Sequence, residues 1–326
     1  MNKRILSLVV AGLIFIGGQT AITHANGKEI RNNDTIFRYD DQSPSYTGWF
    51  NNDFGEWYYI KDGRFVENEW VKDKGSWYYF DEYGNMISNT VKYIDGKDYI
   101  FGSNGAMVNK KGWIKLNLGQ QGMWFYGKGD GTIKDQEWVK DAGKWYYLGG
   151  NGYQDYAGEL TIGPADIGNK TYIFDQNGAM VEKKGWIKLW DSWYYGNGDG
   201  TMKYNQWIKE GNKWYFATYF DGLSQGGNIV TNGVFDVNEK CYIFDQNGAM
   251  IEKKGWIKVG DEWYYGNGDG TIKTGQWIKE YGKWYYLDYV YGDEIYMYGG
   301  NMIAGTSMYI DGMYYSFDGN GVCLNR

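Results

Sequence analysis

The sequence predicts an all-β protein, built as a solenoid or superhelix of stacked β-hairpins. Three observations lead to this fold class: a pair of tryptophans recurs along the chain, a polar and often Gly-containing stretch separates the two, and no segment shows helical periodicity. The 326 residues include 17 Trp, 33 Tyr and 14 Phe, or 20% of the chain, yet the mean hydropathy is −0.62. Many rings must therefore lie near the surface, where large aromatic side chains usually mark recognition.

The first residues are typical of a secretory signal peptide. Lys3 and Arg4 precede an apolar run over residues 5–16, which is too short to cross about 30 Å of hydrocarbon. Small residues follow, and they favour cleavage after Ala25. We expect residues 1–25 to be this signal peptide, and no segment of the mature chain to span a membrane.

The composition of the mature chain excludes several classes of site. Cleavage removes the one histidine, His24, and two basic residues, so that 31 basic and 40 acidic side chains remain, a net charge of −9. Catalysis that depends on histidine is thereby excluded, as is a zinc cluster, since there are only two cysteines. The negative charge disfavours contact with nucleic-acid phosphates. We expect no cofactor, no metal, no nucleic-acid partner, and no disulfide between Cys241 and Cys323, which stand one repeat apart.

The tryptophan pair occurs eight times and uses 16 of the 17 tryptophans. The second Trp of each pair opens an aromatic triplet such as Trp145-Tyr146-Tyr147. Two short aromatic strands joined by a polar turn predict a β-hairpin, and side chains along each strand alternate between its two faces. The pairs are Trp49/Trp57, Trp70/Trp77, Trp113/Trp124, Trp138/Trp145, Trp186/Trp193, Trp207/Trp214, Trp256/Trp263 and Trp277/Trp284.

Four further strands keep the aromatic pattern without tryptophan. Two Trp hairpins followed by one such strand form a triplet, and the triplets recur at intervals of 73 and 70 residues, marked by Gly112, Gly185 and Gly255. We expect about twelve hairpins in four triplets over residues 46–326, after an N-terminal arm or degenerate repeat at residues 26–45. A lone hairpin is marginal in water, so stacked neighbours must bury one another's rings. The four strands are Tyr99-Ile100-Phe101, Tyr172-Ile173-Phe174, Tyr242-Ile243-Phe244 and Tyr315-Ser316-Phe317.

Several of these segments resemble the cell-wall-binding repeats of choline-binding surface proteins. The residues that carry the resemblance are Gly185-Trp186, Trp193-Tyr194-Tyr195 and Gly178-Ala179-Met180, and the pattern covers nearly all of the mature chain. The resemblance implies a left-handed superhelix of hairpins and a non-enzymatic, secreted surface protein. Such a protein is held non-covalently on the Gram-positive cell wall by choline or phosphocholine on teichoic or lipoteichoic acid. Repeat-only members of the family also suggest a cell-wall hydrolase as a second partner, with modulation of autolysis as the consequence.

The resemblance further implies cages in which two tryptophans of one hairpin meet an aromatic ring of the next. Choline suits such a cage because its quaternary ammonium cannot donate a conventional hydrogen bond, whereas aromatic faces offer a negative quadrupole and apolar surface. Carried over by position, four cages combine Trp49, Trp57 and Tyr79; Trp113, Trp124 and Tyr147; Trp186, Trp193 and Phe216; and Trp256, Trp263 and Tyr286. Four others use Trp70/Trp77, Trp138/Trp145, Trp207/Trp214 and Trp277/Trp284 with Phe101, Phe174, Phe244 or Phe317. The middle ring of each triplet is assigned to the core.

Other interpretations stay open at this point. Glucan or other carbohydrate binding would use flat aromatic platforms beside Asn or Asp, whereas rings that converge from three sides favour choline. A hydrolase built on paired carboxylates would have no domain outside the repeats. The Gly- and Asp-rich segments 127–132, 196–201 and 266–271 lack the final Lys-Ser/Thr of a phosphate loop and the final Glu of a calcium loop. We interpret them as turns.

Overall fold

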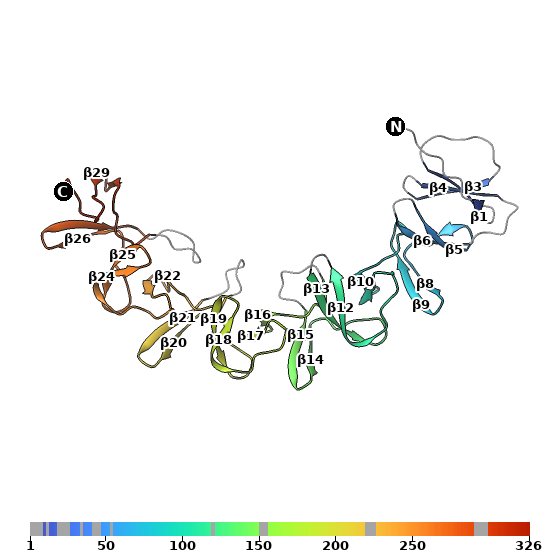
Figure 1. Cartoon of the computed structure of the whole chain (residues 1–326), viewed down its shortest axis with the longest axis horizontal. Coiled ribbons are helices and arrows are strands. Elements are labelled where there is room, and N and C mark those ends of the chain that lie inside the picture. Colours follow the sequence, from blue (N-terminus) through green and yellow to red (C-terminus); the bar gives the residue numbers. More distant parts are fainter. Residues whose placement is uncertain are drawn as a thin grey trace. The chain divides into compact units, whose positions relative to one another are not determined.

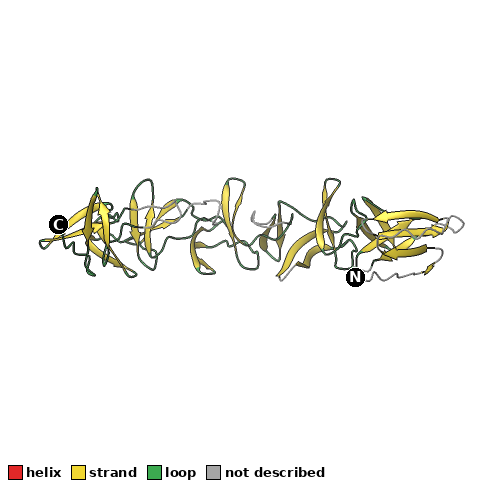
Figure 2. Cartoon of the chain, turned by 90° about the horizontal axis from the view of Figure 1, so that it is seen from above, coloured by secondary structure: helices red, strands yellow, loops and turns green. Residues whose placement is uncertain are grey.

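The structure is a computed structural model, and it describes residues 9–10, 13–17, 27–32, 35–40, 47–52, 55–118, 121–149, 156–218, 226–289 and 299–326. The cleavage site predicted after Ala25 lies outside the described residues. Every regular element in the described part of the chain is a strand (Figure 2), and most strands are paired as short hairpins (Figure 1). The predicted all-β class of hairpins is thus confirmed. No helix among the described residues has the length and hydropathy needed to cross a bilayer.

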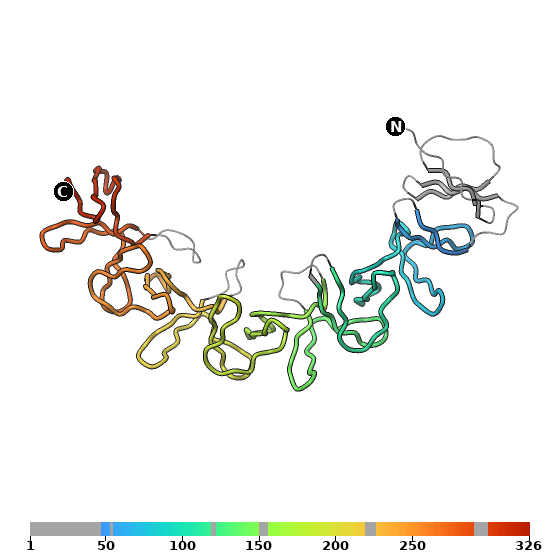
Figure 3. Tube along the Cα trace, viewed as in Figure 1, coloured from blue at the N-terminus to red at the C-terminus, as the bar shows by residue number. Residues whose placement is uncertain are grey.

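The chain divides into two compact units, and each is described by itself. Unit 1 comprises Met1–Lys140 and Tyr147–Thr161, and unit 2 comprises Asp141–Tyr146 and Ile162–Arg326. The boundary therefore falls within β14 (Glu137–Asp141) and β15 (Lys144–Leu148). Figure 3 follows the chain through the successive hairpins of each unit.

Unit 1 begins with a four-stranded sheet in the order β1-β2-β4-β3 and continues with antiparallel hairpins. The first hairpin, β5–β6, carries the short β7 as a third strand, and the later ones are two-stranded. The strands of unit 1 are β1 (Val9–Val10), β2 (Leu13–Gly17), β3 (Gly27–Asn32), β4 (Thr35–Asp40), β5 (Gly48–Asn51), β6 (Trp57–Lys61), β7 (Arg64–Phe65), β8 (Glu69–Asp73), β9 (Ser76–Phe80), β10 (Thr90–Ile94), β11 (Lys97–Phe101), β12 (Lys111–Leu118) and β13 (Gln121–Lys128).

Unit 2 consists of two-stranded antiparallel hairpins in chain order. Its strands are β16 (Gly163–Ile167), β17 (Lys170–Phe174), β18 (Lys184–Leu189), β19 (Ser192–Asn197), β20 (Gln206–Glu210), β21 (Lys213–Ala217), β22 (Gly233–Asp236), β23 (Cys241–Phe244), β24 (Lys254–Val259), β25 (Glu262–Asn267), β26 (Gln276–Glu280), β27 (Lys283–Leu287), β28 (Ser307–Ile310) and β29 (Met313–Ser316).

Tight turns close the hairpins. At the tip between β8 and β9, Lys74 and Gly75 have φ values of 47° and 88°, and Tyr281 and Gly282 between β26 and β27 have 48° and 80°. Positive φ at both central residues is the signature of a type I′ turn, whose twist matches that of the paired strands. Glycine adopts this region without steric cost, which explains the glycine that follows the polar residue in many of these turns.

Backbone hydrogen bonds tie each Trp hairpin to the segment that follows the next hairpin. The carbonyl oxygen of Trp77 accepts a bond from the N–H of Met107 at 2.8 Å, and the carbonyl of Trp214 accepts one from Met250 at 2.7 Å. These bonds fix the spacing of consecutive hairpins. The same bond recurs for the second Trp of every pair, with acceptors and donors Trp57/Met86, Trp77/Met107, Trp124/Leu160, Trp145/Met180, Trp193/Ile229, Trp214/Met250, Trp263/Met302 and Trp284/Cys323.

The apolar core is divided into small clusters, each shared by consecutive hairpins. In unit 1, Ile100 from β11 packs with Ile114 from β12 and Phe125 from β13. In unit 2, Phe216 from β21 packs with Phe244 from β23. Since each cluster joins neighbours along the chain, the folded state is stabilised by hairpin–hairpin contacts, as in other repeat proteins. Cys241 and Cys323 are both free thiols.

Candidate functional site

The strand register gives each Trp hairpin two different faces. In β8–β9, Trp70 lies opposite Tyr79 and Lys72 lies opposite Trp77. Because directly opposed side chains share a face and alternate along the strand, these four residues share one face. Tyr78, in the middle of the triplet, points to the other face. We call the first the tryptophan face and the second the back face.

The two tryptophans of a hairpin form a right-angled corner on the tryptophan face. The ring centroids of Trp70 and Trp77 are 6.4 Å apart and their planes are inclined by 89°. In β20–β21 the corresponding values for Trp207 and Trp214 are 6.3 Å and 88°. The corners at Trp186/Trp193 and Trp277/Trp284 have 6.4 Å and 89°, and the one at Trp49/Trp57 has 6.2 Å and 81°.

The back face of the next hairpin supplies a third ring. The centroid of Tyr99, from β11, is 4.8 Å from that of Trp70, and Tyr242 and Tyr315 lie at the same distance from Trp207 and Trp277. We use the word cage for the first Trp, the second Trp and this middle ring, and name each cage by its first Trp. Other middle rings that lie on first tryptophans are Tyr78 on Trp49 at 4.6 Å, Tyr215 on Trp186 at 4.7 Å and Tyr285 on Trp256 at 5.1 Å.

A phenylalanine adds a fourth ring to the Trp70, Trp207 and Trp277 cages. Phe101 stacks on Trp70 with a centroid distance of 5.7 Å and an interplanar angle of 27°. Phe244 and Phe317 stack on their tryptophans at 6.0 and 5.9 Å, with angles of 24° and 23°. All three phenylalanines are buried, so they form the floor of the cage rather than a wall open to ligand. These phenylalanines are among the residues that the sequence analysis placed next to the pairs.

The third ring of a triplet contacts the first tryptophan of its own hairpin. Tyr79 contacts Trp70 of its own hairpin at 5.2 Å, and the structure does not bring it to the Trp49 corner. Phe216 and Tyr286 likewise lie against Trp207 and Trp277 of their own hairpins, at 5.2 and 5.1 Å, and both are buried. Phe216 and Tyr286 are thus core residues, whereas Tyr79 is half-buried. Tyr147 contacts Trp138 at 5.1 Å.

The hairpin of one predicted pair is longer than the others, and the hairpin of another is divided between the two units. Trp113 contacts Tyr126 at 5.1 Å within the β12–β13 hairpin, whose strands are eight residues long where the other Trp hairpins have four to six. Trp138 belongs to unit 1 and Trp145 to unit 2, so this pair is left out of the cages defined above. Trp256 meets Tyr285 as described above, and its partner Trp263 is 40% exposed.

The sequence does contain a signal that the middle rings belong to the cages. It appears when a strand that lacks tryptophan is aligned with a strand that has one. Tyr99-Ile100-Phe101 aligns with Tyr78-Tyr79-Phe80. The degenerate strand keeps the middle tyrosine and the final phenylalanine but replaces the third ring with isoleucine. Both retained rings lie on the back face and both contact the preceding tryptophan.

The cages are open on one side and are mostly aromatic. The second tryptophans Trp57, Trp77 and Trp193 are 45%, 40% and 42% exposed, whereas the first tryptophans are half-buried. Such an enclosure offers quadrupoles and apolar surface but few hydrogen-bond partners, which suits an apolar cation. Lysine ammonium groups from the opposite strand already lie over second tryptophans: Lys72 over Trp77 at 5.5 Å, Lys115 over Trp124 at 5.7 Å, Lys188 over Trp193 at 5.8 Å, Lys209 over Trp214 at 5.1 Å and Lys279 over Trp284 at 5.2 Å.

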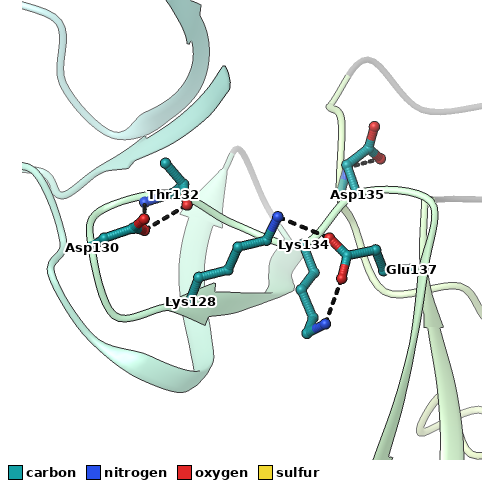
Figure 4. A network of polar contacts seen from close by, with 7 residues as sticks. Lys128, Asp130, Thr132, Lys134, Asp135 and Glu137 are labelled. Atoms are coloured by element: carbon teal, nitrogen blue, oxygen red, sulfur yellow. Dashed lines mark hydrogen bonds and ion pairs between the residues drawn. The ribbon is translucent and has the colours of Figure 1, made fainter. Parts of the chain in front are cut away.

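The Gly- and Asp-rich segments are turns held by their own side chains. In the first of them, Oδ1 of Asp130 accepts hydrogen bonds from the backbone N–H and the hydroxyl of Thr132, at 3.0 and 2.5 Å (Figure 4). The hydroxyl contact lowers the pKa of Asp130. Beyond this segment, at the start of β14, Glu137 accepts from Lys128 at 2.8 Å and from Lys134 at 2.5 Å. Asp199 and Asp269 make the same contacts with Thr201 and Thr271.

The acidic side chains do not gather around a common point. Among the residues that the structure describes, no group of three His, Cys, Asp or Glu is arranged to hold a metal ion. The aspartates of the glycine-rich turns use their carboxylates on their own threonines, as a turn requires.

Comparison with known proteins connects these hairpins to one family. Five segments match the family model described as "Putative cell wall binding repeat", and each contains one tryptophan pair: residues 68–86, 136–154, 205–222, 254–272 and 275–289. Glucosyltransferase-S of Streptococcus mutans is 27% identical over 215 residues, which are 65% of this chain and 14% of that protein. The chain spans 13–15% of the length of the curated relatives that it matches.

Solved structures from Streptococcus pneumoniae are also similar. Choline binding protein F is 27% identical, with a TM-score of 0.39, and the match covers 86% of this chain and 99% of that one. CbpJ is 26% identical, with a TM-score of 0.38, and the match covers 86% of this chain and 100% of that one.

Proposed function

The chain carries cell wall binding repeats of the choline-binding family, and from this premise we propose that its cages bind the choline groups of cell-wall teichoic or lipoteichoic acid. The observation that carries the proposal is the convergence of three rings at the Trp70, Trp207 and Trp277 corners. A quaternary ammonium fits between such rings because its positive charge is spread over methyl groups, which meet aromatic faces without losing hydrogen bonds.

The geometry favours choline over a sugar. A sugar ring stacks on a flat, open platform and uses Asn or Asp side chains to bind its hydroxyls. In the cages, by contrast, the second Trp stands at nearly a right angle to the first, and the middle tyrosine faces the first from the next hairpin. Such a corner surrounds a compact cation on more than one side, which a flat sugar ring does not require.

Repetition compensates for the weakness of one cage. Each ring contributes about 0.5–2 kcal/mol to cation binding. Three rings therefore give a dissociation constant of around a millimolar for one site. Several cages on one chain that meets a polymer bearing many cholines gain about 10²-fold or more in avidity. Repeated weak sites are thus sufficient to hold the protein on the wall without a covalent bond.

The proposal includes the route to the wall and the absence of catalysis. Cleavage after Ala25 would release a secreted chain that begins at Asn26, and mass spectrometry of the protein shed from cells tests this. The role is binding rather than catalysis, with a wall hydrolase as a second partner whose access to choline the protein limits. Purified walls incubated with the protein alone should release no soluble fragments, and walls incubated with a hydrolase should lyse more slowly when the protein is added.

A column experiment tests choline binding directly. The protein should be retained on a diethylaminoethyl matrix in high salt and should elute with free choline. High salt matters because the chain is acidic and would otherwise bind the matrix through charge alone. The control is a variant with the second tryptophans Trp77, Trp214 and Trp284 replaced by alanine, which should elute earlier.

Two outcomes of the column experiment would contradict the proposal. One is elution by salt with no effect of choline. The other is release by soluble dextran and not by choline, which would assign the chain to carbohydrate binding.

A further inference from the structure

One cage already holds a cation from the chain itself. The guanidinium carbon Cζ of Arg326 lies 3.8 Å from the ring centroid of Trp277 and 4.3 Å from that of Trp284. These two tryptophans form the corner of the Trp277 cage, which Tyr315 and Phe317 complete. The guanidinium is therefore in contact with both rings of the corner.

The residues before Arg326 are held firmly beside this cage. The N–H of Cys323 donates to the carbonyl of Trp284 at 2.8 Å, and the N–H of Leu324 donates to the carbonyl of Ser316 at 2.8 Å. The side chain of Asn325 accepts from the N–H of Ser316 and donates to the carbonyl of Tyr314, both at 3.0 Å. Arg326 follows directly, so little freedom is lost when its side chain lies over the rings.

No carboxylate competes for this guanidinium in the described structure. The ion pairs there join Lys61, Lys128 and Lys134 to glutamates, and none involves Arg326. A planar guanidinium stacks well on aromatic faces and is more weakly hydrated than an ammonium group. The rings of Trp277 and Trp284 are thus the partners of the Arg326 guanidinium.

The corresponding positions of the other triplets behave differently. Cys323 occupies the place of Met107 and Met250, so Arg326 corresponds to Lys110 and Lys253. Instead of turning back to a cage, Lys110 donates from Nζ to the carbonyl of Trp113 in the next hairpin at 2.8 Å. The cations over Trp77 and Trp214 come from the opposite strand of the hairpin itself.

We infer that the Trp277 cage is a guanidinium site, filled by Arg326, and that choline enters this cage only in competition with Arg326, whereas in the Trp70 and Trp207 cages a lysine lies over the second tryptophan alone. This inference rests on the proposed function of the cages. A tethered cation competes at an effective concentration in the millimolar range, comparable to the dissociation constant of one cage for choline. Its cation–π contacts with two tryptophans add to that advantage.

Replacement of Arg326 tests the competition. In Arg326→Ala, the choline affinity of the Trp277 cage should rise about twofold or more, as followed at the indole N–H resonance of Trp277. Added ethylguanidinium should then compete with choline at this resonance. The matched control is Lys279→Ala, which removes the other cation over Trp284 and leaves the Arg326 contact in place. An unchanged affinity in Arg326→Ala would overturn the inference.

A second readout needs no choline and separates the two proposals. In the free protein, the side-chain protons of Arg326 should be shifted upfield by the ring currents of Trp277 and Trp284, and Trp277→Leu should remove most of this shift. Unshifted Arg326 protons would overturn the inference even if choline binds the other cages. Shifted Arg326 protons together with no choline binding anywhere would contradict the proposed function and leave the guanidinium site standing.

Discussion

At the scale of single residues, the three rings of a triplet have three different tasks. The first is the exposed wall of its own cage, as in Trp77, which is 40% exposed. The middle ring closes the cage of the preceding hairpin where that hairpin carries a tryptophan pair, as Tyr242 does at Trp207. The third ring, such as Phe216, packs under Trp207 of its own hairpin and is buried. A substitution one residue along the strand therefore changes a different property of the protein.

We predict that Tyr242→Leu weakens choline binding at the Trp207 cage by about 3- to 30-fold, the contribution of one ring. The measurement is a choline titration followed at the indole resonance of Trp214. The control, Phe216→Leu, should leave the midpoint of that titration within about twofold but should lower the melting temperature, because it changes the shape of a buried side chain. Equal loss of affinity in the two variants would show that the third ring also contacts the ligand.

The sequence was sufficient for the tryptophan corners but not for the ring that closes them. The pairing of Trp207 with Trp214 follows from a hairpin and the alternation of its side chains. Which ring arrives from the next hairpin depends on how hairpins stack, and a shift of one residue reverses the face. The Met250–Trp214 backbone bond sets that stacking, and a backbone contact between distant residues leaves no composition signal. For the same reason the sequence did not place Arg326 over Trp277.

At the scale of the hairpin, one glycine lets consecutive segments approach closely. Gly266 follows the aromatic triplet in β25, and a Cβ atom there would collide with the carbonyl oxygen of Lys253 and with Ile257. Gly127 and Gly196 meet Lys110 and Lys183 in the same way. The backbone that leads into each of these hairpins thus lies against the glycine, where a side chain would not fit. This explains why glycine follows the aromatic triplet in the three hairpins that contain Gly127, Gly196 and Gly266.

We predict that Gly266→Ala destabilises the protein by about 1–3 kcal/mol, because the collision involves backbone that cannot move aside cheaply. Gly233→Ala is the matched control, since neither glycine has a positive φ and a Cβ at Gly233 meets nothing within 4 Å. The control should be neutral or slightly stabilising. Urea unfolding measures both, and equal stabilities for the two variants would contradict the close approach.

A buried carboxyl in the segment after β15 makes stability depend on pH. Glu159 is 8% exposed, and burial raises its pKa from 4.5 to about 7. The folded state then holds the proton more tightly than the unfolded state, so the free energy of unfolding should fall as pH rises from about 4.5 to 7. Glu159→Gln should reduce this fall, as measured by melting temperatures between pH 5 and 8. A variant with the same pH dependence as the parent would contradict the assignment.

At the scale of the whole molecule, the repeated hairpin serves stability and binding together. Each small cluster of the core joins two neighbours, and each cage is made by two neighbours. A hairpin therefore cannot be folded alone and cannot bind alone. The sequence was sufficient for the fold class because the repeated tryptophan pairs are needed both for packing between hairpins and for the cages.

Because several cages lie on one chain, we predict that binding to a choline-bearing polymer exceeds binding to free choline by about 10²-fold or more.

The most direct test of the account is an indole N–H spectrum of the ¹⁵N-labelled chain during titration with choline. We predict that the resonances of paired tryptophans such as Trp207 and Trp214 move in a saturable way. Trp190, which is 53% exposed at the tip of β18–β19 and belongs to no pair, should not move. Motion of Trp190 alone, or equal motion of all tryptophans in dextran and none in choline, would contradict the claim that the cages bind choline.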